Sequence, residues 1–396
     1  MGSSDGFPRE LLLQPPEVRL ASFARKVVAH PRLSAAHHTL LQAIRDPARA
    51  SLILVVGPTG VGKTTLRRGI ERHLVAEALP DLATDPGRLP VVAVEAAAPE
   101  SGQFHWKDYY TRALIALNEP LVDRKIDYAV RGFRRDREGT VVVEHTTSAP
   151  ELRRALEQGL RQRRPSAVII DEAQHVRKSA SARRLLDQMD TLKSLAGLTG
   201  ITHVLVGTYE LLGLANLSAQ LSRRSMEIHF GRYRPDRAED LVAFRSVLLT
   251  FQRHLPLTTE PDLVGRWEDF YERSVGCVGV LKSWLDRSLA AALAAGESTV
   301  SRRCLDEHAP PTRTLLSLAR EIKDGEGAFM EAEGDRGELR SLLGLSAPSA
   351  AARVTDGDAQ TRAALGRDRR GTTRGRMAGR RPERDPVGVR EGNDGA

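Results

Sequence analysis

Short apolar runs alternate with amphipathic stretches through the first part of the chain. Four of them read SLILVV, PVVAVEAA, AVIID and ITHVLVGT, and they begin at Ser51, Pro90, Ala167 and Ile201. Such nearly continuous apolar runs are typical of strands buried on both faces of a parallel sheet. The stretches between them, such as PELRRALEQGLRQRR, repeat their apolar residues at helical spacing. Strands alternating with helices predict an α/β fold with a doubly wound parallel sheet.

The pattern changes after residue 233. Helical periodicity dominates from there, in DLVAFRSVLLTFQRHL, DLVGRWEDFYERS, GVLKSWLDRSLAAALAAG and TRTLLSLAREI. We therefore expect an α/β domain over 51–233 and a small α-helical lid subdomain over 234–330. Two amphipathic runs within 1–50 predict a helical lead-in. The segment LSRRSMEIHF, after the fourth apolar run, is expected to begin as a helix, and 119–150 predicts no clear element.

Charge distinguishes the end of the chain. The formal net charge is +8, and the stretch 367–384 holds eight arginines against one aspartate and one glutamate. With almost no apolar residues to bury, this stretch cannot offset the entropy of ordering it, so we expect 346–396 to be disordered. A basic chain favours polyanionic partners, nucleic acid above all, although a merely solubilising tail is an equal alternative.

The cysteines and the N-terminus bear on location. Cys277 and Cys304 have neither metal-ligand spacing nor the pattern of a disulfide framework. The first residues lack the charged start and apolar run of a signal peptide, and no stretch reaches membrane-spanning length. We therefore expect a cytoplasmic protein with no membrane partner.

The first apolar run leads into GPTGVGKTT, at residues 57–65. This matches the phosphate-binding pattern G-x-x-x-x-G-K-[ST], and it lies between a predicted strand and a predicted helix. Its glycines allow backbone N–H groups to surround phosphates, Lys63 should reach the β- and γ-phosphates, and the Thr64 hydroxyl should ligate Mg²⁺. The residues expected to contact the nucleotide here are Gly57, Pro58, Thr59, Gly60, Val61, Gly62, Lys63, Thr64 and Thr65.

Polar residues end the third and fourth apolar runs. Asp171 can hold the Mg²⁺ shell beside the loop, and Glu172 can orient or deprotonate an attacking water. Thr208 is expected on a strand between the other two, facing the γ-phosphate or the water. Two solvated acids at a strand end would be the alternative. Together with the loop, these residues predict a hydrolase site with ATP and Mg²⁺ as cofactors.

The order of these features resembles the layout of AAA+ ATPases, with Walker A and Walker B motifs, a polar strand end, an arginine and a helical lid. More narrowly, VVGPTGVGKTT, PVVAVEAAAP, FHWKDYY, AVIIDEAQHVRK, VLVGTYELL, LSRRSMEIHFGRY and SVGCVGVLKSWL resemble transposition regulators of the TnsC, TniB and MuB type, including those of CRISPR-associated transposons. The resemblance covers roughly 30–300. It implies an ATPase, slow until stimulated by DNA or partners, that assembles with itself as a hexamer- or heptamer-like ring or a helical filament on duplex DNA. It also implies a TniQ-like targeting protein and a transposase as partners, and disassembly on hydrolysis.

The resemblance extends to single residues. Lys63, Thr64, Asp171 and Glu172 match the family's nucleotide site, and Thr208 matches its sensor 1. Arg223 matches the arginine that acts on the ATP of a neighbouring protomer, better than Arg224 does.

Two further positions that match the family concern DNA binding and the lid. Lys107 falls where family members place a contact to the DNA backbone, and Lys125 and Arg131 are further candidates, although each can be a solvated surface charge. In the lid, Val280 stands where members tend to carry the basic sensor 2 residue. Lys282, two residues on, is the candidate substitute in the nucleotide site.

Two other functions remain open. One is a bacterial AAA+ ATPase of secretion or loader type that has no transposase partner. The other is a nucleotide-gated signalling scaffold that hydrolyses ATP too slowly to act as an enzyme.

Overall fold

The computed structural model describes residues 6–46, 50–99, 102–117, 133–135, 141–143, 148–177, 182–215, 225–329 and 333–345. The chain divides into two compact units, Met1–Glu333 and Gly334–Ala396. In the second unit the described residues comprise most of helix α14 (Glu333–Leu342) and the three residues after it. The predicted disordered segment 346–396 lies outside the described residues.

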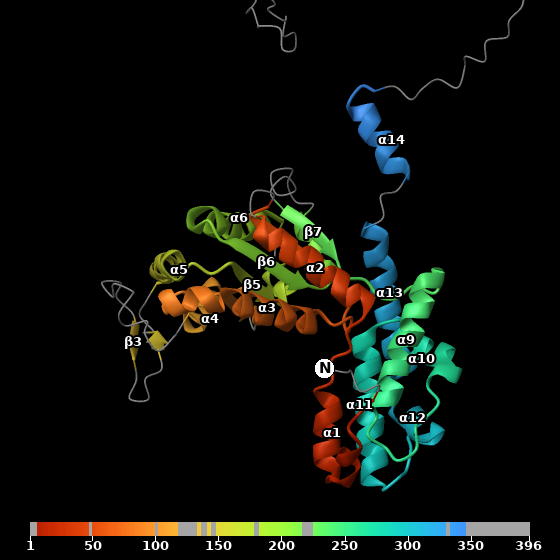
Figure 1. Cartoon of the computed structure of the whole chain (residues 1–396). Coiled ribbons are helices and arrows are strands. Elements are labelled where there is room, and N and C mark those ends of the chain that lie inside the picture. The colour runs from red at the N-terminus through yellow and green to blue at the C-terminus, as the bar shows by residue number, and fades with distance from the viewer. Residues whose placement is uncertain are drawn as a thin grey trace, which may run out of the picture. The chain divides into compact units, whose positions relative to one another are not determined.

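A five-stranded parallel sheet forms the centre of the first unit (Figure 1). Its strand order is β2-β5-β6-β1-β7, so β1 lies between β6 and β7. The four strands predicted from apolar runs are all present. The bounds are β1 Leu52–Val56, β2 Val91–Glu95, β5 Ala167–Asp171, β6 Thr202–Gly207 and β7 Ser225–His229.

Strand β7 is an element that the sequence analysis did not predict. The helix expected at the start of LSRRSMEIHF, around Arg223 and Arg224, lies outside the described residues. Residues Ser225–His229 pair in parallel with β1 along its whole length. In this strand Ile228 is buried, whereas Glu227 and His229 are exposed. An edge strand with polar positions lacks the continuous apolar run that marks the central strands, which is why its signal was weak.

Helices cover both faces of the sheet. Helices α2 (Pro31–Arg45) and α3 (Lys63–Thr84) pack on one face. Helices α4 (Trp106–Ala116), α5 (Ala149–Arg163) and α6 (Ala182–Thr199) pack on the other. In β1, alternate side chains enter the two cores, and all five are fully buried. The doubly wound α/β fold is therefore confirmed, and this two-sided burial explains the apolar runs.

Two short strands lie in the stretch where the sequence predicted no clear element. Strand β3 (Phe133–Arg135) pairs with β4 (Val141–Val143) in antiparallel register. They form a sheet separate from the five-stranded one.

The chain after β7 is helical through residue 329, as its periodicity predicted. Its bounds are α9 Ala238–His254, α10 Trp267–Ser274, α11 Val278–Ala294, α12 Arg302–His308 and α13 Thr312–Phe329. Helices α9 to α12 share one core around the fully buried Trp284. Among the described residues, none of these helices, nor any other, combines the length and apolar character needed to cross a membrane.

The two N-terminal helices pack on different cores. Helix α1 (Pro16–Ala24) lies beside α11 (Figure 1), and its Phe23 packs edge-on against Phe251 with ring centroids 6.1 Å apart. Helix α2 packs on the sheet instead. The segment between them therefore runs from the helical core to the sheet, and it passes the glycine loop.

Candidate nucleotide site

The glycine loop connects β1 to α3 in a conformation that only glycine adopts readily. Gly60 and Gly62 have φ angles of +78° and +113°. At Gly57 a side chain is excluded for another reason, because a Cβ there would lie 2.1 Å from the carbonyl oxygen of Phe230. Helix α3 begins at Lys63, so its unpaired N–H groups and positive dipole end face the loop. These are the features of an anion site.

Lys63 is buried beneath this loop, with 8% of its surface exposed. Its Nζ donates hydrogen bonds to the carbonyl oxygens of Gly57, at 2.9 Å, and Pro58, at 3.0 Å. Burial lowers the pKa of the Lys63 ammonium, and nearby carboxylates, Glu172 foremost, oppose that shift. In the part of the chain that the structure describes, Lys63 forms no ion pair. A buried ammonium held by neutral carbonyls is suited to receive a phosphate.

Asp171 ends β5 with both carboxylate oxygens engaged. Arg67 donates from Nε to Oδ2 at 2.8 Å, and the backbone N–H of Glu172 donates to Oδ1 at 3.0 Å. Arg67 lies one helical turn after Lys63 on α3, and it also pairs with Glu71. The sequence analysis missed Arg67, although its spacing of four residues from Lys63 puts both on one helix face.

Glu172 is joined to the end of β6 by a single side chain. Gln174, in the 3₁₀ turn η3 (Ala173–Arg177), donates from Nε2 to Oε2 of Glu172. Its Oε1 accepts from the backbone N–H of Thr208 at 3.3 Å. The Thr208 hydroxyl is buried and has no hydrogen-bond partner among the described residues. Because β6 lies between β1 and β5, Thr208 stands between the loop and the acidic pair, as predicted.

A cavity of about 380 Å³ opens beside the loop. Its walls come from the segment between α1 and α2, from the loop with the start of α3, and from helices α9 and α11. That volume lies within the range of small-molecule sites, about 300 to 1,000 Å³. The lining includes Val28, His30, Val61, Thr65, Gly279 and Lys282.

Helix α11 contacts the loop directly, and we use the word lid for helices α9 to α12, whose residues share one core. The backbone N–H of Val280 donates to the carbonyl oxygen of Gly60 at 3.2 Å. A Cβ at Gly279 would lie 2.4 Å from that same oxygen, so the contact requires glycine. Lys282 lines the cavity, but its ammonium pairs with Asp286 and lies 4.2 Å from the ring centroid of Phe23.

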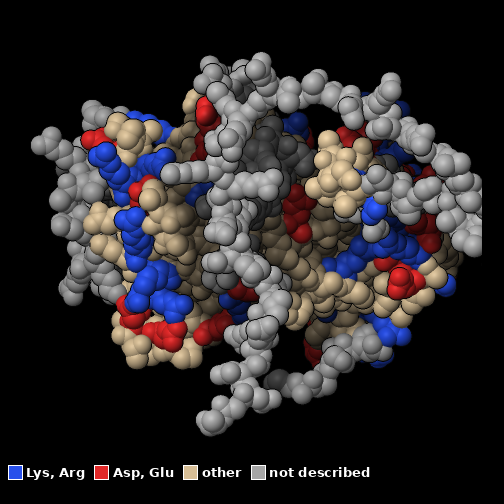
Figure 2. Space-filling model, turned by 90° about the horizontal axis from the view of Figure 1, so that it is seen from above, with Lys and Arg blue, Asp and Glu red and all other residues tan. Residues whose placement is uncertain are grey.

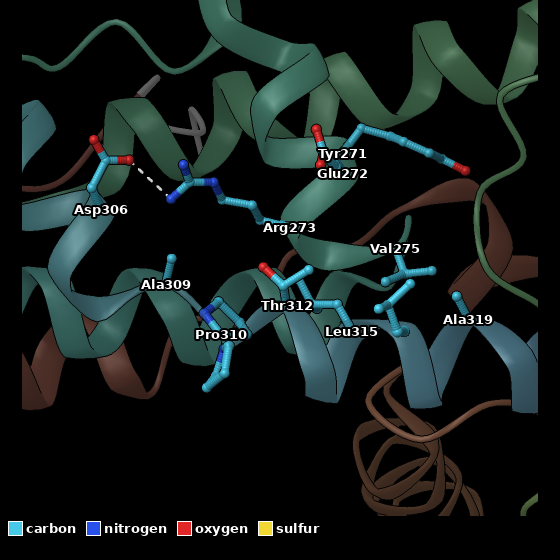
Figure 3. A pocket seen from close by; sticks show the side chains of 12 residues that line it. Tyr271, Glu272, Arg273, Val275, Asp306, Ala309, Pro310, Thr312, Leu315 and Ala319 are labelled. Carbon is cyan, nitrogen blue, oxygen red and sulfur yellow. Dashed lines mark ion pairs between the residues drawn. The ribbon is translucent and has the colours of Figure 1, made fainter.

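A second cavity, of about 550 Å³, lies between α10 and the α12–α13 connection (Figure 3). Arg273 pairs with Asp306 at 2.9 Å on one side of it, and Leu315 and Ala319 of α13 line another. Its lining includes no residue of the glycine loop or of the acidic pair.

The basic candidates are only partly described. Lys107 is exposed on the first turn of α4. Three predicted site residues, Lys125, Arg131 and Arg223, lie outside the described residues. On and next to α5, arginines 154, 161 and 164 are exposed. Figure 2 shows Lys and Arg side chains gathered along one side of the face that is seen from above.

Residues 45–214 match the model of a protein family described as an AAA domain. The matched range begins before β1, includes the glycine loop and the acidic pair, and ends just after Thr208. This part of the chain is an AAA-type P-loop ATPase domain, and the five-stranded parallel sheet with its covering helices has the AAA+ fold.

Solved structures similar to this chain include Cdc6p from Pyrobaculum aerophilum, with 17% identity and a TM-score of 0.47 over 75% of this chain and 73% of that one. The ORC2 protein of Aeropyrum pernix in ADPNP–ADP complexes has 14% identity and a TM-score of 0.46, over 82% and 89%. Drosophila ORC bound to DNA has 13% identity and a TM-score of 0.41, over 87% and 85%. A comparison with curated proteins found no match.

Proposed function

We propose that this chain is an ATP-dependent, DNA-binding regulator of transposition. In this proposal it binds ATP and Mg²⁺, assembles with copies of itself on duplex DNA, and disassembles when it hydrolyses ATP. The observation that carries the ATPase part is the buried Lys63 ammonium, held by two carbonyls beside Asp171 and Glu172. The transposition part rests on the sequence motifs, including SVGCVGVLKSWL in the lid.

The nucleotide would lie across the loop. The cavity of about 380 Å³ would hold the base between the α1–α2 segment and the lid, and Lys63 would bind the β- and γ-phosphates. Lys282 lines this cavity and is the lid cation nearest the sequence position of sensor 2.

The cation site would use Thr64 and Asp171. Thr64 is exposed at the start of α3, and oxygen atoms are the ligands that Mg²⁺ prefers. Bound Mg²⁺ would neutralise charge on the phosphates. Until then Arg67 keeps the Asp171 carboxylate oriented and compensates its charge.

Hydrolysis would depend on the residues that follow strands β5 and β6. Glu172 would accept a proton from the attacking water, and the unpartnered Thr208 hydroxyl would bind the γ-phosphate or orient that water. Arg223 would act on the ATP of the neighbouring protomer and stabilise charge in the transition state.

Duplex DNA would be bound through its backbone. The net charge of +8 and the exposed Lys107 support such binding, with Lys125 and Arg131 as further phosphate ligands. A TniQ-like targeting protein and a transposase are the proposed protein partners. An AAA+ ATPase that works without a transposase would share the nucleotide site but would leave transposition unaffected.

ATP-dependent assembly on DNA tests this proposal. With ATP or a non-hydrolysable analogue, electron micrographs are expected to show rings or filaments on duplex DNA of unrelated sequences. Lys63→Ala should abolish ATP binding and assembly together. Glu172→Gln should keep both, lower kcat by roughly 100-fold or more, and prolong the DNA-bound state. Monomers alone under these conditions would contradict the proposal.

A further inference from the structure

We propose that Gln174 is a positioning residue that couples the end of β6 to the carboxylate of Glu172. The inference deepens the proposed function and rests on it, because it assumes that Glu172 acts on the attacking water. Gln174 is buried, with 8% of its surface exposed, and contacts both partners with its side-chain amide.

The two hydrogen bonds of Gln174 determine the orientation of its amide. A carboxylate can only accept a hydrogen bond, so Nε2 must face Glu172. A backbone N–H can only donate, so Oε1 must face Thr208, at 3.3 Å. Turning the amide over would break both bonds, and burial makes such a loss costly.

The two hydrogen bonds of Gln174 form a bridge between Glu172 and Thr208, and the backbone around Gln174 fits this bridge. A Cβ at Gly207 would lie 2.5 Å from Oε1 of Gln174, so only glycine allows the amide to approach the strand end. Glu172 has a φ of 51°, which is uncommon for a residue with a side chain. The N–H of His175 donates to the Glu172 carbonyl at 3.0 Å and closes the turn that brings residues 172 and 174 together.

The bridge lies where backbone pairing between the two strands has ended. The last register pair of β5 and β6 is Ile170 with Leu205. Beyond it, Gln174 connects the two strand ends through its side chain. When the Thr208 hydroxyl binds the γ-phosphate, the Thr208 backbone would shift. The side-chain amide of Gln174 would transmit that shift to Glu172. Gln174 holds Oε2, and we assign Oε1 to the water.

A double-mutant cycle tests this role. Gln174→Leu removes both hydrogen bonds while leaving an apolar side chain in the space. We expect the Kd for ATP to stay within about threefold and kcat to fall roughly 10- to 100-fold, because a misplaced carboxylate loses much of its catalytic effect. In the Glu172→Gln background the same substitution should change the residual rate less than threefold, since no carboxylate remains to be oriented.

Gln188 on α6 supplies the matched control. It is as buried as Gln174, at 8% exposed, and its Oε1 has no hydrogen-bond partner among the described residues. Gln188→Leu should leave unchanged the ratio between the hydrolysis rate with Glu172 and the rate in the Glu172→Gln background. If Gln174→Leu does not fold, as thermal unfolding would reveal, Gln174→Met replaces it at nearly equal volume.

The outcomes separate two failures. The role of Gln174 is refuted if Glu172→Gln strongly lowers the wild-type rate of hydrolysis, but Gln174→Leu keeps the wild-type kcat or lowers the rate by the same factor in both backgrounds. If the wild type does not hydrolyse ATP, or Glu172→Gln retains full activity, the proposed function itself fails.

Discussion

His203 illustrates how much a single buried side chain can matter to this fold. It lies in β6, is fully buried, and has its Nδ1 3.0 Å from the carbonyl oxygen of Ile201. Burial lowers the pKa of His203 from 6.5 to about 4, an effect only partly opposed by that backbone contact. The folded protein therefore holds this imidazole neutral at pH values where the unfolded chain protonates it.

The stability of the protein should consequently fall in mild acid. The contribution of His203 is fully present above pH 6.5 and is lost as pH falls from 6.5 towards 4, because only the unfolded state binds the proton there. Between pH 7 and pH 5 it should remove roughly 2 kcal/mol from the free energy of unfolding. Denaturant unfolding of His203→Gln should show a correspondingly shallower pH dependence, with the remaining slope including His30, whose pKa burial also lowers to about 4. Parallel pH curves for wild type and variant would contradict this account.

Among the elements, α13 is attached to the α/β domain by few contacts. Only Ile322 and Gly325 of this helix are buried. Phe329 stacks on His229 with ring centroids 4.5 Å apart, and Glu326 accepts from Arg232 at 3.1 and 3.3 Å. Gly325 lies against Tyr209, the residue directly after Thr208. The helix therefore packs beside the strand end that we assign to the γ-phosphate.

Gly325 offers a way to loosen α13 selectively. A Cβ at this position would lie 2.1 Å from the Tyr209 ring, so Gly325→Ala should displace the helix and cost about 1–3 kcal/mol of local stability. Hydrogen exchange in α13 should become faster, while exchange in β1 and β6 stays unchanged. Gly327→Ala is the control, because a Cβ there meets nothing within 4 Å and alanine favours the helix by up to about 1 kcal/mol. Equal protection of α13 in both variants would show that the Tyr209 contact does not hold it.

On the scale of the whole molecule, the glycine loop lies where three packed cores meet. Two cores cover the faces of the sheet, and the third is formed by α1 with the lid helices. The lid core reaches the loop through the contact of Val280 with Gly60. Among the described residues, the buried members of all three cores lie before position 306.

Because the composition of 346–396 predicts a disordered segment, its removal should leave the Tm and the rate of ATP hydrolysis without DNA unchanged. The deletion also removes the eight arginines of 367–384, which can bind phosphates. The affinity for duplex DNA should fall, by about tenfold at low salt, and its dependence on salt concentration should become weaker. A lower Tm would refute the expectation that this segment lies outside the folded cores, and unchanged DNA affinity would refute its part in binding.

Much of the nucleotide site could be predicted from local sequence. The loop, Asp171, Glu172 and Thr208 each follow a buried apolar run, and the carboxyl ends of parallel strands lie at one edge of a sheet. Arg67 and Gln174 could not be found in this way. Arg67 contacts a residue 104 positions away, and Gln174 contacts one 34 positions away. No periodic pattern encodes such pairs.

The sequence by itself determined the class of fold and the phosphate loop, because both depend on runs and spacings of a few residues. The tertiary structure alone decided that Ser225–His229 is an edge strand, since pairing with β1 outweighs its weak local pattern. It alone decided that α1 joins the lid core and that Gly279 packs on Gly60. These features arise from close packing between distant segments, which local propensity does not specify.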